Sequence, residues 1–112
     1  MRDWPELNPE KRYFSIGEVA SYLDVNTSLV RFWEKEFDSL KPKKGQSGNR
    51  MYSHADLSEL KLIYHLVKER GYTLEGARNK LKFERKETEK KSLLAERLAK
   101  VKFALENLKN QL

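Results

Sequence analysis

Four polar side chains that share one helical face are the residues best placed to do chemistry in this sequence. In a helix that begins near residue 27, positions i, i+1, i+4 and i+8 lie on the same side. Here they are Thr27, Ser28, Arg31 and Lys35. The two hydroxyls lie at the positive end of the helix, where phosphates and base edges can approach. Arg31 is long enough to reach a guanine edge or a phosphate, and a surface ion pair is its alternative role.

The helix that carries these residues follows another helix after a tight turn. Ser15 and Glu18 form a capping box, so we expect the first helix to begin there and to end near Leu23. Asp24-Val25 then forms the turn, and Asn26 is a good N-cap for the second helix. A helix, a tight turn and a helix indicate a helix-turn-helix, whose second helix lies in the major groove of DNA.

The second helix, expected to run to about residue 37, separates into two faces. Its apolar residues at i, i+3 and i+7 are predicted to pack inward: Val30, Trp33 and Phe37. Phe32 lies between the faces, and periodicity assigns it to neither. Glu34 and Glu36 occupy the distal half, where we expect them to point away from the duplex.

A basic hairpin is predicted between residues 41 and 52, because two short runs flank a Gly-Gln-Ser-Gly tip. Residues 41–50 contain four basic side chains and no acidic one. The candidates for phosphate contacts are Lys43, Lys44 and Arg50, and a solubilising loop is the alternative. Tyr52, at the exit of the hairpin, either hydrogen-bonds a phosphate or packs beneath the hairpin.

Two more helices are expected after the hairpin. Ser53 and Asp56 resemble a second capping box, which opens a helix of about four turns that ends at Gly71. Its inner stripe is Leu57, Leu60, Ile63 or Tyr64, and Val67. Thr73 caps the next helix, whose inner residues are Leu74, Ala77 and Leu81. Residues 1–12 form an arm held by Trp4.

The C-terminal segment has a heptad pattern. Its apolar residues are spaced 4, 3, 4, 3 and 4 apart: Leu94, Leu98, Val101, Leu105, Leu108 and Leu112. This a/d seam favours pairing with another helix over folding back on the chain's own core, although so short a seam leaves the orientation open. We therefore expect an arm (1–12), a winged helix-turn-helix domain (13–82) and a dimerisation helix (83–112).

Composition excludes several classes of function. The chain has 112 residues, a net charge of +6 and a mean hydropathy of −0.83, which suit one small domain with a polyanionic partner. Without cysteine there are no disulfides or thiolate metal sites, and His54 and His65 are isolated, so we expect no enzyme, metal or cofactor. With neither a bilayer-spanning run nor a signal peptide, the sequence predicts a cytoplasmic, nucleoid-associated protein without a membrane partner.

Several motifs together resemble the MerR family of bacterial transcriptional regulators. They are IGEVA at 16–20, VRFWE at 30–34, GNRMY at 48–52, Asp56-Leu57 and GYTLE at 71–75. The resemblance implies a mainly α winged helix-turn-helix with an antiparallel coiled-coil homodimer on a pseudo-palindromic operator in double-stranded DNA. The positions that match the family's DNA contacts are Thr27, Ser28, Arg31 and Phe32 on the helix, Lys44, Arg50 and Tyr52 on the first wing, and Tyr72 and Thr73 on the second wing.

The resemblance also implies a mechanism and a departure from it. Family members bend and untwist an overlong promoter spacer so that RNA polymerase meets both promoter elements, which is a form of indirect readout. Activating members carry an effector domain or metal-binding cysteines, whereas this sequence ends at Leu112 without cysteine, so we expect no small-molecule effector. The alternatives are an architectural or excisionase-like DNA-binding protein and a winged-helix module that binds protein.

Overall fold

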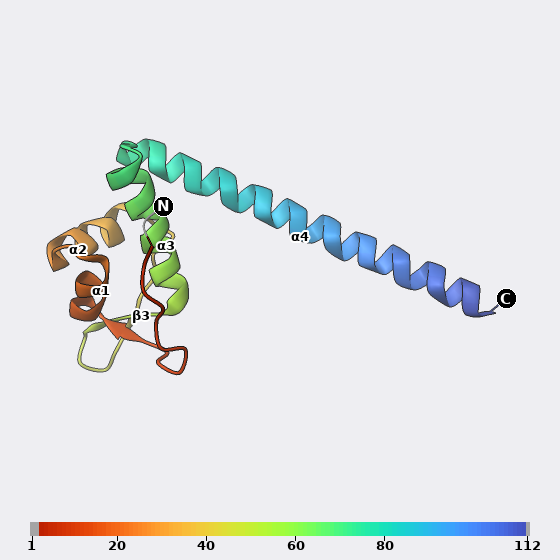
Figure 1. Cartoon of the computed structure of the whole chain (residues 1–112), viewed down its shortest axis with the longest axis horizontal. Coiled ribbons are helices and arrows are strands. Elements are labelled where there is room, and N and C mark those ends of the chain that lie inside the picture. The colour runs from red at the N-terminus through yellow and green to blue at the C-terminus, as the bar shows by residue number, and fades with distance from the viewer. Residues whose placement is uncertain (1–2, 112) are drawn as a thin grey trace. The chain divides into compact units, whose positions relative to one another are not determined.

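The computed structural model describes residues 3–111 (Figure 1). Its elements in chain order are β1 (Phe14–Ser15), α1 (Ile16–Leu23), α2 (Thr27–Glu36), β2 (Lys43–Lys44), β3 (Arg50–Tyr52), α3 (His54–Tyr64), the π-helical segment η1 (His65–Glu69) and α4 (Leu74–Gln111). They form two compact units, one ending at Ala77 and the other beginning at Arg78. Over residues 3–111, no helix combines the length and apolar character needed to cross a membrane.

The predicted turn between α1 and α2 is present. Both hydrogen bonds of the Ser15–Glu18 capping box form. Asp24 closes α1 in the left-handed conformation, with φ 58° and ψ 50°, which a short polar side chain tolerates. Asn26 is the N-cap residue of α2, but its side chain makes no capping hydrogen bond, and its carbonyl oxygen accepts the amides of Leu29 and Val30 instead.

The predicted hairpin is confirmed, and it belongs to a three-stranded antiparallel sheet of order β1-β3-β2. Lys43 pairs with Met51 and Lys44 with Arg50, and Gly48 adopts a φ of 80° at the tip. The strand β1, which the sequence did not predict, pairs Phe14 with Tyr52. Two residues are too short a run to show a strand period, so only the tertiary structure reveals β1.

The core of the first unit lies where α1, α2 and α3 meet the sheet. Val30, Trp33 and Phe37 are buried, as the two-face division of α2 predicted. The other buried apolar side chains of this unit are Phe14, Val19, Ala20, Leu23, Leu40, Tyr52, Leu57, Leu60, Ile63, Leu66 and Ala77.

A π-turn changes the predicted inner stripe at the end of α3. The amide of Arg70 donates to the carbonyl of His65, five residues back, at 2.9 Å. This wider turn rotates the side chains that follow it about the helix axis, so Leu66 is buried while Val67 is only half-buried. The assignment of Val67 to the inner stripe is therefore wrong. Gly71 ends the segment with a φ of 71°, the left-handed C′ position that was predicted.

The helix α4 runs without interruption from its cap to Gln111. The Thr73 hydroxyl oxygen accepts the amide of Gly76 at 3.0 Å, which confirms the predicted cap. Ala77 and Leu81 are buried, as expected. The expected boundary between residues 82 and 83 falls within this continuous helix.

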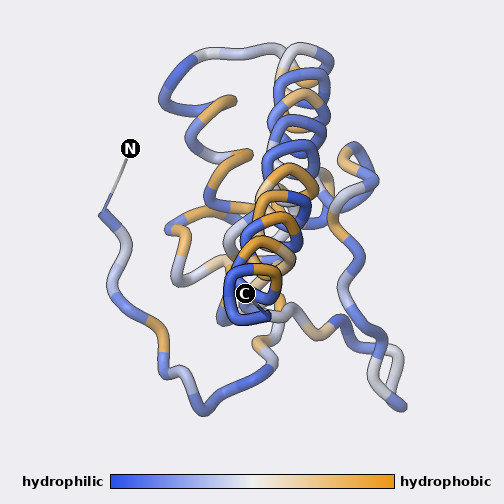
Figure 2. The backbone as a smooth tube through the Cα atoms, turned by 90° about the vertical axis from the view of Figure 1, so that its right-hand side faces the viewer, coloured by the Kyte–Doolittle hydropathy of each residue, from blue (hydrophilic) through white to orange (hydrophobic). Residues whose placement is uncertain are grey.

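Apolar positions recur along α4 (Figure 2), and those within residues 83–111 are exposed. The described seam residues are 56–61% exposed: Leu94, Leu98, Val101, Leu105 and Leu108. Leu112 lies outside the described residues. Among residues 3–111 the seam therefore has no covering surface.

The N-terminal arm is held by an aromatic cluster, as the sequence predicted. The ring centroid of Trp4 lies 5.7 Å from that of Tyr22 and 5.2 Å from that of Tyr64. The Tyr22 hydroxyl also donates to the carbonyl of Pro5. The arm is therefore attached to both α1 and α3.

Candidate nucleic-acid interface

The outer face of α2 presents the predicted side chains to solvent. Thr27, Ser28, Arg31, Phe32 and Lys35 are all exposed. Across residues 3–111, no carboxylate forms an ion pair with Arg31, so the ion-pair alternative for this residue is not realised. The face thus combines two hydroxyls, an aromatic ring and two cations that are available to a ligand.

The hairpin of β2 and β3, called the wing from here on, brings further cations to the surface. Lys43 and Lys44 are exposed on β2, which is one of the two edge strands of the sheet. The Lys43 ammonium lies 5.8 Å from the ring centroid of Tyr13, close enough for a cation–π contact. Both lysines remain able to reach a phosphate.

Glu34 connects α2 to the wing, a role that the sequence analysis missed. Its Oε1 accepts a 2.8 Å hydrogen bond from Nε of Arg50, and its Oε2 lies 2.6 Å from the same nitrogen. Oε2 also accepts from the Tyr52 hydroxyl at 3.1 Å. The side chain of Glu34 faces β3 and is only 17% exposed. Its position four residues after the buried Val30 was the available signal, because i and i+4 share a helix face.

Tyr52 takes the second of the two roles that the sequence left open. It is 0% exposed and its hydroxyl donates to Glu34, so it packs beneath the wing and not at the surface where the phosphate contact was predicted. Burial, reinforced by the neighbouring Glu34 carboxylate, raises the pKa of Tyr52 well above its usual value. The phenol is therefore neutral and serves as a fixed donor.

Arg50 is shared between the wing and the candidate surface. Its hydrogen bond to Glu34 raises the pKa of the guanidinium, which stays charged. Because Nε is engaged by Glu34 while 37% of the side chain remains exposed, the rest of the guanidinium is available to an anion. The predicted phosphate contact of Arg50 stays a prediction.

A concave notch of about 290 Å³ lies between α1, α2 and the wing. It is lined by Ser15, Ile16, Arg31, Gly48, Asn49 and Arg50. Two guanidinium groups from different elements thus border one hollow, an arrangement suited to an anionic oxygen group. Periodicity could not reveal the notch, because its lining residues are far apart in the sequence.

The second predicted wing lies at the start of α4. Tyr72 is half-buried, with the Arg70 guanidinium 5.9 Å from its ring centroid, and Thr73 is exposed. The Thr73 oxygen caps α4, so its hydroxyl proton remains available to donate. A Cβ at Gly76 would lie 3.1 Å from that oxygen, which favours glycine there.

Both histidine rings lie close to other groups of the chain. His54 donates from Nε2 to the carbonyl of Lys11 at 2.7 Å and packs edge-on against Phe14. His65 is partly buried, with Nδ1 3.7 Å from a carboxylate oxygen of Glu69. In the described part of the chain, no group of three or more potential ligands could hold a metal ion.

Comparison with known proteins gives a consistent family. Residues 14–84 match the sequence model described as MerR HTH family regulatory protein. The HTH-type transcriptional regulator MlrA of Escherichia coli K12 is 34% identical over 50 residues, 45% of this chain and 21% of that protein. ZntR, an HTH-type transcriptional regulator of the same organism, is 32% identical over 68 residues, 61% of this chain and 48% of its own length. The alignments therefore span less than half of these curated relatives.

Solved structures show the same fold. A MerR family transcriptional regulator from Bacillus cereus aligns with a TM-score of 0.54 and 30% identity over 80% of this chain and 74% of its own. HiNmlR, described as a MerR family regulator lacking the sensor domain and bound to promoter DNA, aligns with a TM-score of 0.54 over 88% and 86% of the two chains. At 19% identity, the second similarity supports the fold alone.

Proposed function

Since this chain belongs to the MerR HTH family of regulatory proteins, and the curated proteins that it resembles are HTH-type transcriptional regulators, we propose that it binds a pseudo-palindromic promoter operator as a homodimer. One recognition helix α2 from each chain enters a major groove. The wings contact the flanking phosphates, so that backbone contacts position the helix and α2 reads base edges.

The observation that carries the DNA-binding mode is the attachment of the wing to α2 through Glu34. Arg50 and Tyr52 of β3 both donate to this carboxylate. The cations of the wing and the polar face of α2 are thereby held in one fixed arrangement. A fixed arrangement is what simultaneous backbone and groove contacts require, because less entropy is lost on binding.

We assign the contacts residue by residue. Base or phosphate contacts are made by Thr27, Ser28, Arg31 and Phe32 of α2; phosphate contacts are made by Lys43, Lys44 and Arg50 of the first wing and by Tyr72 and Thr73 of the second wing. Tyr52 is removed from this set because it is buried. The polar chemistry of the α2 face disfavours the alternative of a protein-binding winged helix, which would need apolar residues there.

The proposed dimer uses the seam of α4. Isolated amphipathic helices are marginal in water, and this seam is uncovered in the chain, so a second copy supplies the missing surface. Leu112 would extend the seam at its end.

The charges beside the seam support an antiparallel pair. Heptad positions e and g flank the seam on either side. At position e the cations lie in the second half of the seam, at Lys102 and Lys109. At position g they lie in the first half, at Lys90 and Arg97. In an antiparallel pair, e faces e and g faces g, so these cations meet the neutral residues of the opposite half, such as Ala95 and Ala104. In a parallel pair, Arg97 of one chain would face Lys102 of the other, which is unfavourable.

We further propose that the dimer regulates transcription by bending and untwisting its promoter, so that RNA polymerase meets both promoter elements. The support is membership of the family together with the physics of indirect readout, in which a small dimer changes DNA shape through backbone contacts. No small-molecule effector enters the proposal.

The test is selection of duplexes from a randomised DNA pool at near-physiological salt with competitor DNA. We expect an enriched inverted repeat, whose half-site spacing also tests the promoter-distortion mechanism. Salt-sensitive binding without enrichment would replace the proposal with an architectural role. Absence of binding would indicate a protein-interaction module.

A further inference from the structure

The N-terminal arm lies outside the region that matches the family, which begins at residue 14. It is nevertheless attached to the domain at several points. Besides the contacts of Trp4 and Pro5, Asn8 forms a turn. Its carbonyl oxygen accepts the amide of Lys11 at 3.2 Å, and its side-chain oxygen accepts the amide of Glu10 at 3.0 Å. The chain is therefore ordered just before it enters β1.

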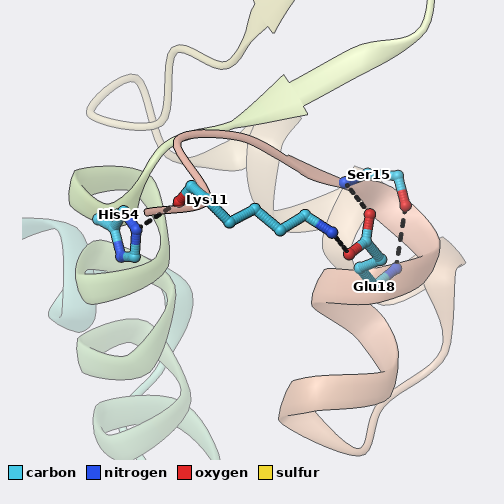
Figure 3. A network of polar contacts seen from close by, with 4 residues as sticks. All are labelled: Lys11, Ser15, Glu18 and His54. Atoms are coloured by element: carbon cyan, nitrogen blue, oxygen red, sulfur yellow. Dashed lines mark hydrogen bonds and ion pairs between the residues drawn. The ribbon is translucent and has the colours of Figure 1, made fainter. Parts of the chain in front are cut away.

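Lys11 contacts three elements at once, and Figure 3 shows two of these contacts, with His54 of α3 and with Glu18 of α1. Its carbonyl accepts from Nε2 of His54, the first residue of α3. Its ammonium pairs with the carboxylate of Glu18 on α1 and lies 5.3 Å from the ring centroid of Phe14 on β1. The backbone and the side chain of this one residue thus contact α3, α1 and β1.

The contacts continue from Lys11 to the wing. Glu18 also accepts the amide of Ser15, the second residue of β1, at 3.3 Å. Ser15 pairs with Met51 of β3, and the residues on either side of Met51 are the ones that donate to Glu34 of α2. Ser15 itself lines the notch beside Arg31. A strand of two residues is marginal alone, so its place in the sheet depends on what holds its ends.

We propose that Lys11 and His54 are positioning residues for the DNA-binding surface, acting together as a clamp that keeps β1 paired with β3 and so sets the position of the wing beside α2. The arm thereby adjusts DNA binding from outside the family domain without contacting DNA. The DNA readout of this inference rests on the proposed function, whereas its strand-pairing readout does not.

The first experiment compares His54→Ala with His54→Gln in the full chain. Glutamine keeps a donor near the position of Nε2, whereas alanine removes it. The loss of one hydrogen bond corresponds to a roughly three- to tenfold increase in the population in which the strands are locally open. We expect that increase in the amide exchange of β1 and β3 in His54→Ala, a comparable loss of DNA affinity, and recovery of both in His54→Gln.

The second experiment compares Lys11→Met with Arg12→Met. Both variants lose one positive charge from adjacent exposed positions, but only Lys11 contacts Glu18 and Phe14. We expect exchange in β1 and β3 to rise roughly twofold in Lys11→Met, as suits an exposed ion pair, and to stay unchanged in Arg12→Met.

The results separate the clamp from the proposed function. Unchanged strand exchange in both His54→Ala and Lys11→Met would overturn the clamp whether or not the protein binds DNA. Faster exchange with unchanged affinity for the selected duplex would overturn its role in positioning the wing. If the wild-type chain binds no DNA, the proposed function fails, and faster exchange in these variants still supports the clamp on strand pairing.

Discussion

The two units of this chain use the same apolar residue types with opposite results. In the first unit, leucine, valine and aromatic side chains from three helices and from the strands β1 and β3 bury one another, and Leu60 is 0% exposed. In the second unit, the regular seam of α4 leaves Leu98 61% exposed. The comparison shows that an apolar period identifies the face of a helix that needs covering, but not the molecule that covers it.

The two units also differ in how polar groups are used. Glu34 in the first unit holds two donors from a strand that is distant in sequence. Ion pairs in the second unit join residues three or four apart on one helix, such as Lys80 with Glu84 and Lys90 with Glu87. Local pairs stabilise a helix by a few tenths of a kcal/mol each, whereas the Glu34 contacts determine a tertiary arrangement.

The largest expected effect comes from breaking the surface that is uncovered in one chain. Leu105→Asp places a charge in the seam, and we expect monomers in sedimentation. Because operator binding then loses the linkage of two half-sites, affinity falls by a factor on the order of 10². Asn110→Asp, which adds the same charge away from the seam, is the control. A Leu105→Asp protein that stays dimeric would show that the seam is not the dimer interface.

A matched pair of leucine truncations tests the comparison directly. Leu60→Ala creates a cavity in the core and should lower the free energy of unfolding by about 2–5 kcal/mol. Leu98→Ala, made on the exposed seam, should change it far less at concentrations where the chain is monomeric. Denaturant unfolding measures both, and equal losses would mean that the seam is covered within the chain.

The recognition face is tested by Arg31→Ala. If Arg31 reads a base, binding to the selected duplex should weaken by roughly 1–3 kcal/mol while binding to unrelated DNA changes little. Competition assays on the two duplexes measure the difference. Equal losses on both would reduce Arg31 to a phosphate contact.

The attachment of the wing predicts a pH dependence. Because burial raises the pKa of Tyr52 in the folded state, the unfolded chain releases that proton first as the pH rises. Its contribution to stability is therefore constant below pH ~10, the usual pKa of tyrosine, and declines above it. We expect the difference in unfolding free energy between wild type and Tyr52→Phe to shrink above that pH, and a constant difference would contradict the assignment.

The smallest expected effect is on the wing. Lys44→Ala should reduce the slope of the logarithm of the binding constant against the logarithm of salt concentration by about one unit, as expected for one lost phosphate contact. Binding titrations over a salt series measure this slope. If it does not change, Lys44 is a solubilising residue and lies outside the interface.

Local signals predicted much of the fold because each acts within a few residues. The capping box at Ser15, the turn at Asp24 and the helix end at Gly71 all formed where the sequence placed them. The outer face of α2 was also predicted, since side-chain direction follows from helical period. The π-turn before Gly71 was missed because nothing in its residue types departs from an ordinary helix.

The candidate site was less predictable where it depends on contacts between distant residues. Tyr52 and Arg50 resemble surface contacts when taken from a hairpin alone, yet one is buried and the other is shared with Glu34. The notch beside Arg31 and the role of His54 were likewise hidden, because their partners come from β1 and the arm.

The sequence by itself determined the family, the order of the helices, the polar face of α2 and the heptad seam of α4, because all of these follow from residue types at short, regular spacings. Only the tertiary structure decided that Glu34 faces the wing, that Tyr52 is buried and that Lys11 contacts α1, α3 and Phe14 of β1. The physical reason is that burial and hydrogen-bond partners depend on which distant segments pack together, and no local period encodes that choice.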